Sequence, residues 1–233
     1  MNIALLGYGR MGKEIEKVAI QRGHTIVHKI EGDISSYNFT TVDVAIDFSI
    51  PSAAFQNISH CIKHQIPVIS GTTGWLEKYD EVVNMCEAEK GAFIYASNFS
   101  LGVNIFFEMN NYLAKMMSQL EDYKVSIEEI HHTKKLDAPS GTAITLAEGV
   151  IQQTNYNAWK LDEAANATEI PIVVKRIPEV PGTHEITYTS SVDSISIKHE
   201  AHNRQGFALG AVVAAEWIQN RVGVFTMKNV LNI

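Results

Sequence analysis

The sequence is poor in cysteine, long apolar runs and positive charge. Cys61 and Cys86 are the only cysteines among 233 residues, and their spacing matches no metal or redox motif. Two reduced thiols are typical of a cytoplasmic protein. No apolar stretch approaches the roughly 20 residues that a membrane-spanning helix needs. The formal net charge of −7 disfavours nucleic-acid binding through bulk charge. We therefore expect a cytoplasmic protein that binds neither membranes nor nucleic acid.

The first hundred residues alternate short apolar runs with amphipathic stretches. The apolar runs predict five strands, at 2–7, 24–30, 42–49, 66–71 and 92–97. The amphipathic stretches predict helices between them, at 11–23, 51–65 and 76–91. Strands separated by helices of this length indicate a Rossmann-type, doubly wound parallel sheet.

The pattern changes after residue 103. A long helix over 104–120 leads to a half-exposed strand over 123–132, and a second helix follows over 140–153. Further strands, joined by turns, are expected at 171–177, 183–191 and 194–201. The apolar helix over 206–221 should return to the first domain. We therefore predict an α/β protein with a dinucleotide-binding domain, 1–103 with 206–233, and a smaller α+β domain with a mixed sheet, 104–205.

A glycine-rich loop follows the first predicted strand and opens the first helix. Its sequence, GYGRMG, fits the G-x-G-x-x-G pattern in the structural context that the pattern requires. Glycines let the backbone turn sharply and approach a pyrophosphate at the positive end of the helix. This segment predicts a nicotinamide dinucleotide, contacted by Gly7, Gly9, Arg10, Met11 and Gly12.

The residues after the second strand leave the choice of cofactor open. Glu31 lies 19 residues after Gly12, where an acidic side chain can accept a hydrogen bond from the 2′-hydroxyl of NAD. Lys29, Arg10 and Lys13 are equally well placed to meet the 2′-phosphate of NADP. We therefore expect NADH or NADPH as the cofactor.

Two further loops end the fourth and fifth predicted strands. Ligands of an open parallel sheet bind beyond the carboxyl ends of its strands, so both loops fall where a nicotinamide is expected. Their small and hydroxyl-bearing residues permit close backbone approach. The residues expected near the cofactor are Gly71, Thr72, Thr73, Ala96, Ser97, Asn98 and Phe99.

The segment EEIHHTKKLDAPSGTA, residues 128–143, gathers basic groups ahead of a helix start. A histidine can act as a general acid, and a lysine can stabilise developing negative charge. The free N–H groups of a helix start can hold a carboxylate, here at Ser140, Gly141 and Thr142. This combination favours a small, multiply anionic substrate reduced by a nicotinamide cofactor.

Two other interpretations of this segment are a metal site and a solvated charge run. A metal site needs further ligands, and His184, His199 and His202 are scattered over other predicted strands and loops. We therefore expect no metal, while a solvated loop stays an alternative on this segment alone.

Six motifs of the chain resemble those of the dihydrodipicolinate reductase (4-hydroxy-tetrahydrodipicolinate reductase) family. They are GYGRMG, DFS, GTTG, SNFSLGVN, EEIHHTKKLDAPSGTA and NRQGFALGAV, in the family's order from residue 7 to about residue 213. The HHxxKxDAPSGT pattern is highly specific to that family. The resemblance implies NAD(P)H-dependent reduction of 4-hydroxy-tetrahydrodipicolinate to tetrahydrodipicolinate in diaminopimelate and lysine biosynthesis. It also implies a homotetramer, assembled through the second domain.

The resemblance assigns roles to individual residues. It makes His131 the proton donor and Lys135 its catalytic partner, and it places His132 against the substrate. It implies that a substrate carboxylate is held by Ser140, Gly141 and Thr142. It places Arg204 and Phe207 near the cofactor and the 71–73 and 96–99 segments around the nicotinamide. Lys134 matches no required position and is interpreted as supporting charge.

The chain departs from the family pattern at two positions. Leu6 stands where the family often has the first of three glycines, so Gly7 supplies the turn instead. Gly32 stands where an arginine often follows the acidic residue, which weakens any inference about NAD against NADP.

Two rival functions remain compatible with the dinucleotide motif. One is a different two-domain dehydrogenase, such as one acting on an amino acid. The other is a non-catalytic NAD sensor whose second domain binds a partner. The 128–143 segment disfavours the sensor, because a sensor needs no proton donor beside an anion pocket.

Overall fold

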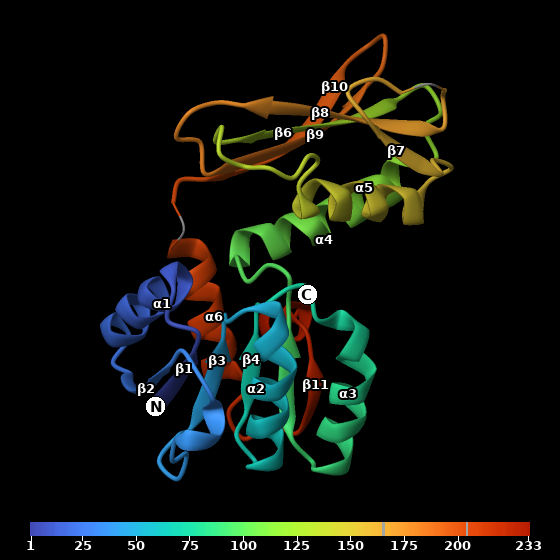
Figure 1. Ribbon diagram of the computed structural model, residues 1–233. Helices are drawn as coiled ribbons and strands as arrows, with labels where there is room; N and C mark the ends of the chain where they lie inside the picture. Colours follow the sequence, from blue (N-terminus) through green and yellow to red (C-terminus); the bar gives the residue numbers. More distant parts are fainter. Residues whose placement is uncertain (165, 204) are drawn as a thin grey trace. The chain divides into compact units, whose positions relative to one another are not determined.

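The computed structural model describes residues 1–164, 166–203 and 205–233 (Figure 1). It divides into two compact units, unit 1 comprising Met1–Leu101 with Gln205–Ile233 and unit 2 comprising Gly102–Arg204. Arg204, expected near the cofactor, lies outside the described residues. In the described part of the chain, no helix has the length and apolar character needed to cross a membrane.

Unit 1 is built on a six-stranded sheet in the order β11-β5-β4-β3-β1-β2, with every neighbouring pair parallel. Its strands are β1 (Asn2–Leu6), β2 (Thr25–Ile30), β3 (Val44–Asp47), β4 (Val68–Ser70), β5 (Ala92–Tyr95) and β11 (Gly223–Phe225). Its helices are α1 (Arg10–Gln21), α2 (Pro51–Lys63), α3 (Tyr79–Ala88), α6 (Gln205–Trp217) and α7 (Met227–Leu231), with short 3₁₀ turns at Ile34–Ser36 and Leu76–Lys78. The predicted Rossmann-type sheet is confirmed, with the sixth strand β11 added by residues beyond the last predicted helix.

The alternation of side chains along β1 explains why helices cover both faces of this sheet. Ile3 and Leu5 are buried on the face that packs with α1 and α6. Ala4 and Leu6 are buried on the other face, with α2 and α3. Successive strand residues point to opposite faces, and each buried Leu or Ile contributes roughly 1.5–3 kcal/mol. The apolar helix α6 therefore packs on unit 1, beside α1 (Figure 1).

Unit 2 contains a mixed five-stranded sheet in the order β10-β9-β6-β8-β7. Strand β6 pairs antiparallel with β9 and parallel with β8, which confirms the expected mixed sheet. The strands are β6 (Lys124–His131), β7 (Ala158–Leu161), β8 (Glu169–Arg176), β9 (Gly182–Thr189) and β10 (Ser194–Ala201). The helices α4 (Leu101–Met117) and α5 (Gly141–Gln153) cover one face (Figure 1).

Strand β6 positions the chemistry of unit 2 through its own alternation. Val125 and Ile127 are buried in the core beneath the helices. Glu129 and His131 continue the same side of the strand and are buried as well. Two titratable side chains therefore stand at the end of an apolar stripe, where burial must be compensated by partners.

Candidate active site

The glycine loop of unit 1 joins β1 to α1, and its three glycines differ in the space around them. Gly7 has φ of +92°, and a Cβ there would lie 2.3 Å from the carbonyl oxygen of Phe48. A Cβ at Gly12 would lie 2.4 Å from the carbonyl oxygen of Gly7. Gly9, the N-cap of α1, has no atom within 4 Å of its Cβ position. Gly7 and Gly12 thus serve the fold, while Gly9 leaves open space beside the helix N-terminus, which suits a dinucleotide pyrophosphate.

These surroundings predict different results for two matched substitutions. We expect Gly7→Ala to lower stability by about 1–3 kcal/mol, because it combines backbone strain with overlap on Phe48. Gly9→Ala should keep the melting temperature but weaken NADH or NADPH binding about tenfold or more, because its methyl group enters the space left for the ligand. Thermal unfolding and a fluorescence titration of the reduced cofactor measure both effects. Equal loss of stability in the two variants would contradict this assignment.

A cavity of about 360 Å³ opens beyond the carboxyl ends of β1, β3 and β4. Its lining consists of Gly9, Arg10, Met11, Phe48, Ser49, Pro51, Gly71, Thr72 and Thr73. The structure thus brings the glycine loop and the segment after β4 together, as their places at the strand ends suggest. This cavity and the open helix start fit a nicotinamide dinucleotide.

The segment after β5 lies against the same wall of unit 1. The ring of Phe99 is 99% buried and lies 5.7 Å from the ring of Phe48. The side chain of Asn98 accepts a hydrogen bond from the Ser100 N–H. Ala96 and Ser97 connect this turn to β5. That these residues contact the nicotinamide stays a prediction, as does the role of Phe207, which is half-buried near the start of α6.

Asp47 organises this region, although no sequence pattern indicates a role for its side chain. One carboxylate oxygen accepts hydrogen bonds from Ser49 Oγ at 2.7 Å and Asn57 Nδ2 at 3.1 Å. The other accepts from Ser70 Oγ at 2.7 Å and Thr72 Oγ1 at 2.8 Å. Burial raises the pKa of Asp47, while the four hydrogen bonds favour its charged form. The DFS motif therefore ties the ends of β3 and β4 together beneath the cavity.

The residues expected to select between NAD and NADP differ in exposure and in partners. Glu31 is exposed directly after β2. Lys29 Nζ lies 2.6 Å from the carboxylate of Glu16 and 4.7 Å from the ring centroid of Tyr8. The Tyr8 hydroxyl also donates to Glu16, and the Lys29 hydrogen bond lowers the pKa of the Glu16 carboxyl. Because Lys29 already has an anionic partner, the exposed Arg10 and Lys13 are the more available cations.

The site of unit 2 centres on Glu129, whose side chain is fully buried. Its Oε1 accepts hydrogen bonds from both terminal nitrogens of Arg176, each at 3.2 Å. Its Oε2 accepts the Ser140 N–H at 2.8 Å. Arg176 also donates to the carbonyl oxygen of Asp137 at 2.7 Å. One carboxylate thus connects β6 and β8 to the start of α5, and Arg176 extends the network into the preceding loop.

Two histidines flank this carboxylate. His131 Nδ1 lies 3.8 Å from Glu129 Oε1, and His184 Nε2 lies 3.9 Å from Glu129 Oε2. The two imidazole centroids are 5.1 Å apart. Burial lowers the pKa of His131 to about 4, and it lowers the pKa of His184 to about 3. At these pKa values both imidazoles are neutral at pH 7.

Lys135 lies in the loop between β6 and α5. Its Nζ donates to both carboxylate oxygens of Asp137, at 2.9 and 2.7 Å. Its backbone N–H donates to the carbonyl oxygen of His132 at 3.1 Å, which closes a turn. His132 is half-buried, whereas Lys134 is exposed. The ammonium group of Lys135 is thus paired with the Asp137 carboxylate.

Ser140 caps α5 with groups that the sequence analysis assigned to the substrate. Its Oγ accepts the Ala143 N–H at 3.2 Å and lies 3.0 Å from His184 Nε2. Its own N–H donates to Glu129. Gly141 and Thr142 follow as the first helical residues, whose N–H groups the helix itself cannot use. The donors for a carboxylate at this helix start are therefore those of Gly141 and Thr142.

Glu129, His131 and His184 also have the composition of a metal site, since one ligand atom of each lies within 4.8 Å of the others. Both Glu129 oxygens, however, already accept hydrogen bonds, one of them from the Arg176 cation. A divalent ion here would meet that positive charge at close range. The arrangement therefore suits proton transfer beside an anion better than metal binding.

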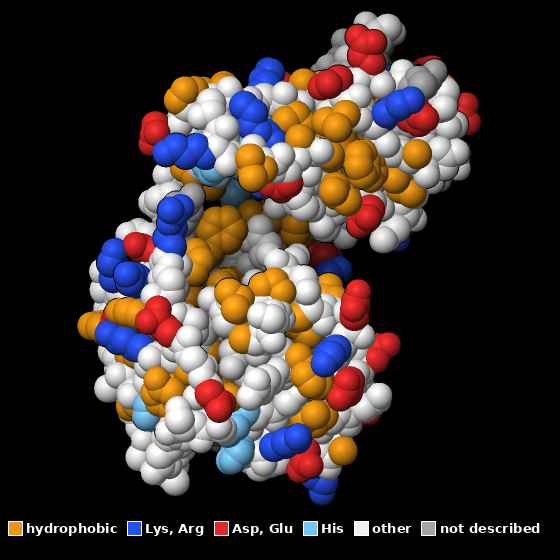
Figure 2. All heavy atoms as spheres, viewed as in Figure 1, with side chains coloured by type: hydrophobic (Ala, Val, Ile, Leu, Met, Phe, Trp, Pro, Cys, Tyr) orange, Lys and Arg blue, Asp and Glu red, His pale blue; other side chains and the backbone are white. Residues whose placement is uncertain are grey.

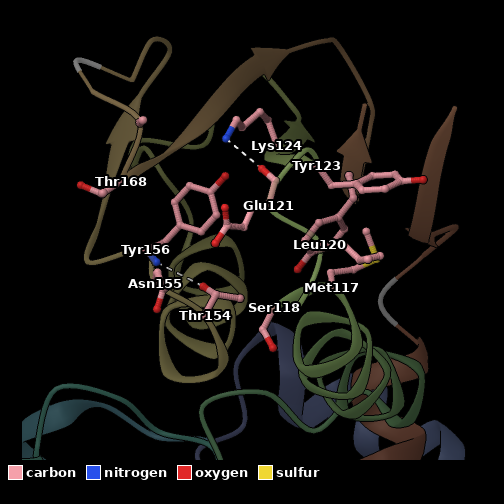
Figure 3. Close-up of a pocket in the computed structure, with 12 residues that line it drawn as sticks. Met117, Ser118, Leu120, Glu121, Tyr123, Lys124, Thr154, Asn155, Tyr156 and Thr168 are labelled. Atoms are coloured by element: carbon pink, nitrogen blue, oxygen red, sulfur yellow. Dashed lines mark hydrogen bonds between the residues drawn. The ribbon is translucent and has the colours of Figure 1, made fainter. Parts of the chain in front are cut away.

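A second cavity, of about 240 Å³, lies at the opposite end of β6 (Figure 3). Tyr156 Oη accepts the Val125 N–H at 3.3 Å in its wall, and Lys124 Nζ donates to the Glu121 carbonyl oxygen at 3.1 Å. Its described lining residues include none of those predicted for catalysis. The residues of unit 2 that are predicted for catalysis lie at the other end of the strand, beside His131 and the loop that follows it.

Family comparisons match almost the whole chain. Residues 1–99 match the family model described as "Dihydrodipicolinate reductase, N-terminus", and residues 102–231 match "Dihydrodipicolinate reductase, C-terminus". The chain belongs to the dihydrodipicolinate reductase family. A 4-hydroxy-tetrahydrodipicolinate reductase from Christiangramia forsetii is 60% identical over 235 residues, covering 100% of this chain and 98% of the relative. The enzyme of that name from Thermosipho africanus is 35% identical over 99% of this chain and 98% of its own.

A solved structure shows the same fold. The dipicolinate-bound dihydrodipicolinate reductase from Paenisporosarcina sp. TG-14 superposes with a TM-score of 0.77 and covers 97% of each chain, at 23% identity. A probable dehydrogenase from Thermotoga maritima has a TM-score of 0.58 at 10% identity and covers 100% of this chain and 89% of its own. Likeness at such identities shows the fold alone. The family assignment therefore depends on the sequence matches.

Sequence patterns gave no catalytic or binding role to three residues of the unit 2 network, which are Glu129, Arg176 and His184. Glu129 lies inside the family motif that identified the segment, but no pattern within the motif indicated its burial. Arg176 lies 47 residues further along the chain and meets Glu129 only because β6 pairs with β8. His184 was considered only as a scattered metal ligand, and β9 brings it beside Ser140.

Proposed function

We propose that this chain is an NAD(P)H-dependent 4-hydroxy-tetrahydrodipicolinate reductase of diaminopimelate and lysine biosynthesis. The observation that carries this proposal is the 60% identity, over its full length, to an enzyme of that name. The two units supply matching chemistry, with an open helix N-terminus and cavity in unit 1 and a histidine–lysine anion site in unit 2. The product is tetrahydrodipicolinate.

The reduced nicotinamide supplies a hydride to the substrate ring when it is bound. The 4-hydroxyl group leaves as water together with one hydrogen of the neighbouring ring carbon, which gives a carbon–carbon double bond conjugated to the ring C=N. The hydride would add at one carbon of this double bond, and His131 supplies the proton that the other carbon takes up. Lys135 exchanges its Asp137 partner for a substrate carboxylate and stabilises the anionic intermediate. The N–H groups of Gly141 and Thr142 hold a carboxylate and fix the ring for reaction, while His132 contacts the substrate.

Cofactor binding is assigned to the open loop of unit 1. The helix start at Gly9, Arg10 and Met11 receives the pyrophosphate, and Gly71 to Thr73 line the nicotinamide end of the cavity. Gly7 and Gly12 give the loop its shape. Glu31, exposed after β2, would accept a hydrogen bond from the adenosine ribose. The reductant is NADH or NADPH.

A homotetramer assembled through unit 2 and a cytoplasmic location complete the proposal. The helices α4 and α5 pack on one face of the sheet of unit 2, and β10 carries exposed residues that a second copy can cover. Cys61 and Cys86 are free and buried, as reduced thiols of a cytoplasmic enzyme would be. Basic and acidic side chains are interspersed on the surface seen in Figure 2.

The test is a reduction assay with purified protein, NADH or NADPH, and the condensation product of pyruvate and aspartate semialdehyde. The absorbance of the reduced cofactor should fall, and it should not fall when an amino acid or keto acid replaces the condensation product. An unchanged absorbance with the condensation product would overturn the proposed function. Cofactor binding without any turnover would favour an NAD sensor instead.

A further inference from the structure

Glu129 is the most fully enclosed charged group around His131. It has no exposed surface, and three donors reach its two oxygens from β8 and from the start of α5. An isolated carboxylate in such a place is strongly unfavourable, so its retention requires both the Arg176 charge and the Ser140 N–H. A residue that served packing alone would need no charge at this position.

We propose that Glu129 is a positioning residue of the reductase, which holds the start of α5 against β6 and sets the protonation of His131 by its negative charge. This inference rests on the proposed function and deepens it. Two contacts carry it: the 2.8 Å bond from Ser140 N–H and the 3.8 Å approach of His131 Nδ1.

The charges facing His131 balance one another in the ligand-free protein. Glu129 on its own strand is paired with Arg176 from β8. Lys135 is paired with Asp137, both in the loop that follows β6. A further titratable neighbour is His184 from β9, whose imidazole is neutral, and His132 directly follows His131 in the chain. With two compensated ion pairs around it, the buried imidazole of His131 stays neutral until further negative charge arrives.

A bound dicarboxylate changes this balance. Its negative charges meet Lys135 and the α5 start, and they favour a proton on His131. Glu129 Oε1 already stands 3.8 Å from Nδ1, so it favours the same proton. Arg176 opposes it, because like charges disfavour one another. The carboxylate and the guanidinium therefore shift the pKa of His131 in opposite directions.

The experiment compares the pH dependence of kcat in wild type and in Glu129→Gln. Because His131 donates a proton, kcat falls as the pH rises above the pKa of His131 in the substrate complex. Removing the Glu129 charge should shift this pH-dependent fall of kcat to lower pH by about one unit. At pH values above the wild-type pKa of the substrate complex, kcat should therefore be up to about tenfold lower than in wild type, and well below that pKa the two should converge. The KM for NADH or NADPH should stay within about twofold, since unit 1 is unchanged.

Glu128→Gln is the matched control. Glu128 is the preceding residue of β6 and pairs with Lys175 of β8 at 2.5 Å, but it is partly exposed and lies on the other side of the strand. Its substitution removes an equivalent ion pair without touching His131. We expect the pH-dependent fall of its kcat to match wild type, and kcat itself to stay within about twofold, as for an ordinary surface pair.

Arg176→Gln supplies a second variant, which keeps the test decisive if Glu129→Gln does not fold. Arg176→Gln should shift the fall of kcat to higher pH, because it removes a positive charge from the surroundings of His131 and so raises the pKa of that imidazole. Shifts of the two variants in the same direction, or no shift in either, would overturn the inference. Failure of wild type to reduce the substrate would instead overturn the proposed function, so the two failures are distinguishable.

Discussion

Lys135→Ala should lower kcat about 100- to 1000-fold while changing the dissociation constant of NADH or NADPH less than about twofold. The reason is local charge. The Lys135 ammonium group already binds a carboxylate, that of Asp137, through two hydrogen bonds. A substrate carboxylate can take that place, and the same cation then stabilises the intermediate as negative charge develops. The glycine loop and the cavity of unit 1 contain no part of this segment, so cofactor binding should persist.

Lys134→Ala is the control for this prediction. Lys134 is adjacent in the sequence and exposed, and neither the structure nor the family pattern gives it a required role. Its removal should leave kcat and KM within about twofold of wild type. Steady-state kinetics and a cofactor fluorescence titration measure both variants. Loss of cofactor binding in Lys135→Ala, or equal losses of kcat in the two variants, would show that the role given to Lys135 is wrong.

His131→Gln should abolish both the proton uptake that accompanies binding of a dicarboxylate and most of the turnover. Burial holds the pKa of His131 near 4 in the free protein, so the imidazole binds no proton at pH 7. A dicarboxylate adds negative charge and raises that pKa, so wild type should take up a proton with the ligand. Glutamine cannot take up this proton, and kcat should fall about 100- to 10,000-fold.

Calorimetric titration with dipicolinate, in buffers of different ionisation enthalpy, measures the proton uptake directly. Wild type should take up close to one proton per ligand at pH 7, and less as the pH falls toward 4, where the free imidazole is already charged. Equal proton uptake by His131→Gln would assign the proton to another group. Retention of the wild-type kcat would remove His131 from the mechanism.

Local sequence patterns predicted most of the fold, because the spacing of apolar residues differs between helices and strands. The apolar runs of unit 1 and the helices between them require a parallel sheet covered on both faces, as Ile3 and Ala4 illustrate. Three elements gave no such signal. β7 and β11 have four and three residues, and α7 has five. Such short segments are ordered by pairing with neighbours rather than by their own pattern.

The site residues that lie close together in the sequence could be predicted. Those that meet only because distant strands pair could not. The strand-end rule predicts that Gly9 and Thr73 lie at the same edge of the sheet, and both line one cavity there. No local pattern indicates that Arg176 reaches Glu129, since only the register of β8 against β6 joins them. Likewise the sequence predicts that the Ser140 N–H binds an anion at the start of α5. In the structure, that N–H instead donates a hydrogen bond to the Glu129 carboxylate.

The transfer of a labelled hydride tests the central claim most directly. Wild-type protein would be given the condensation product of pyruvate and aspartate semialdehyde with NADH or NADPH deuterated at the transferable position of the nicotinamide. The account predicts that the tetrahydrodipicolinate formed carries one deuterium on its ring carbon skeleton, detected by mass spectrometry as a gain of one mass unit. Oxidised cofactor accompanied by an unlabelled product, or deuterium that stays wholly in the cofactor, would contradict it.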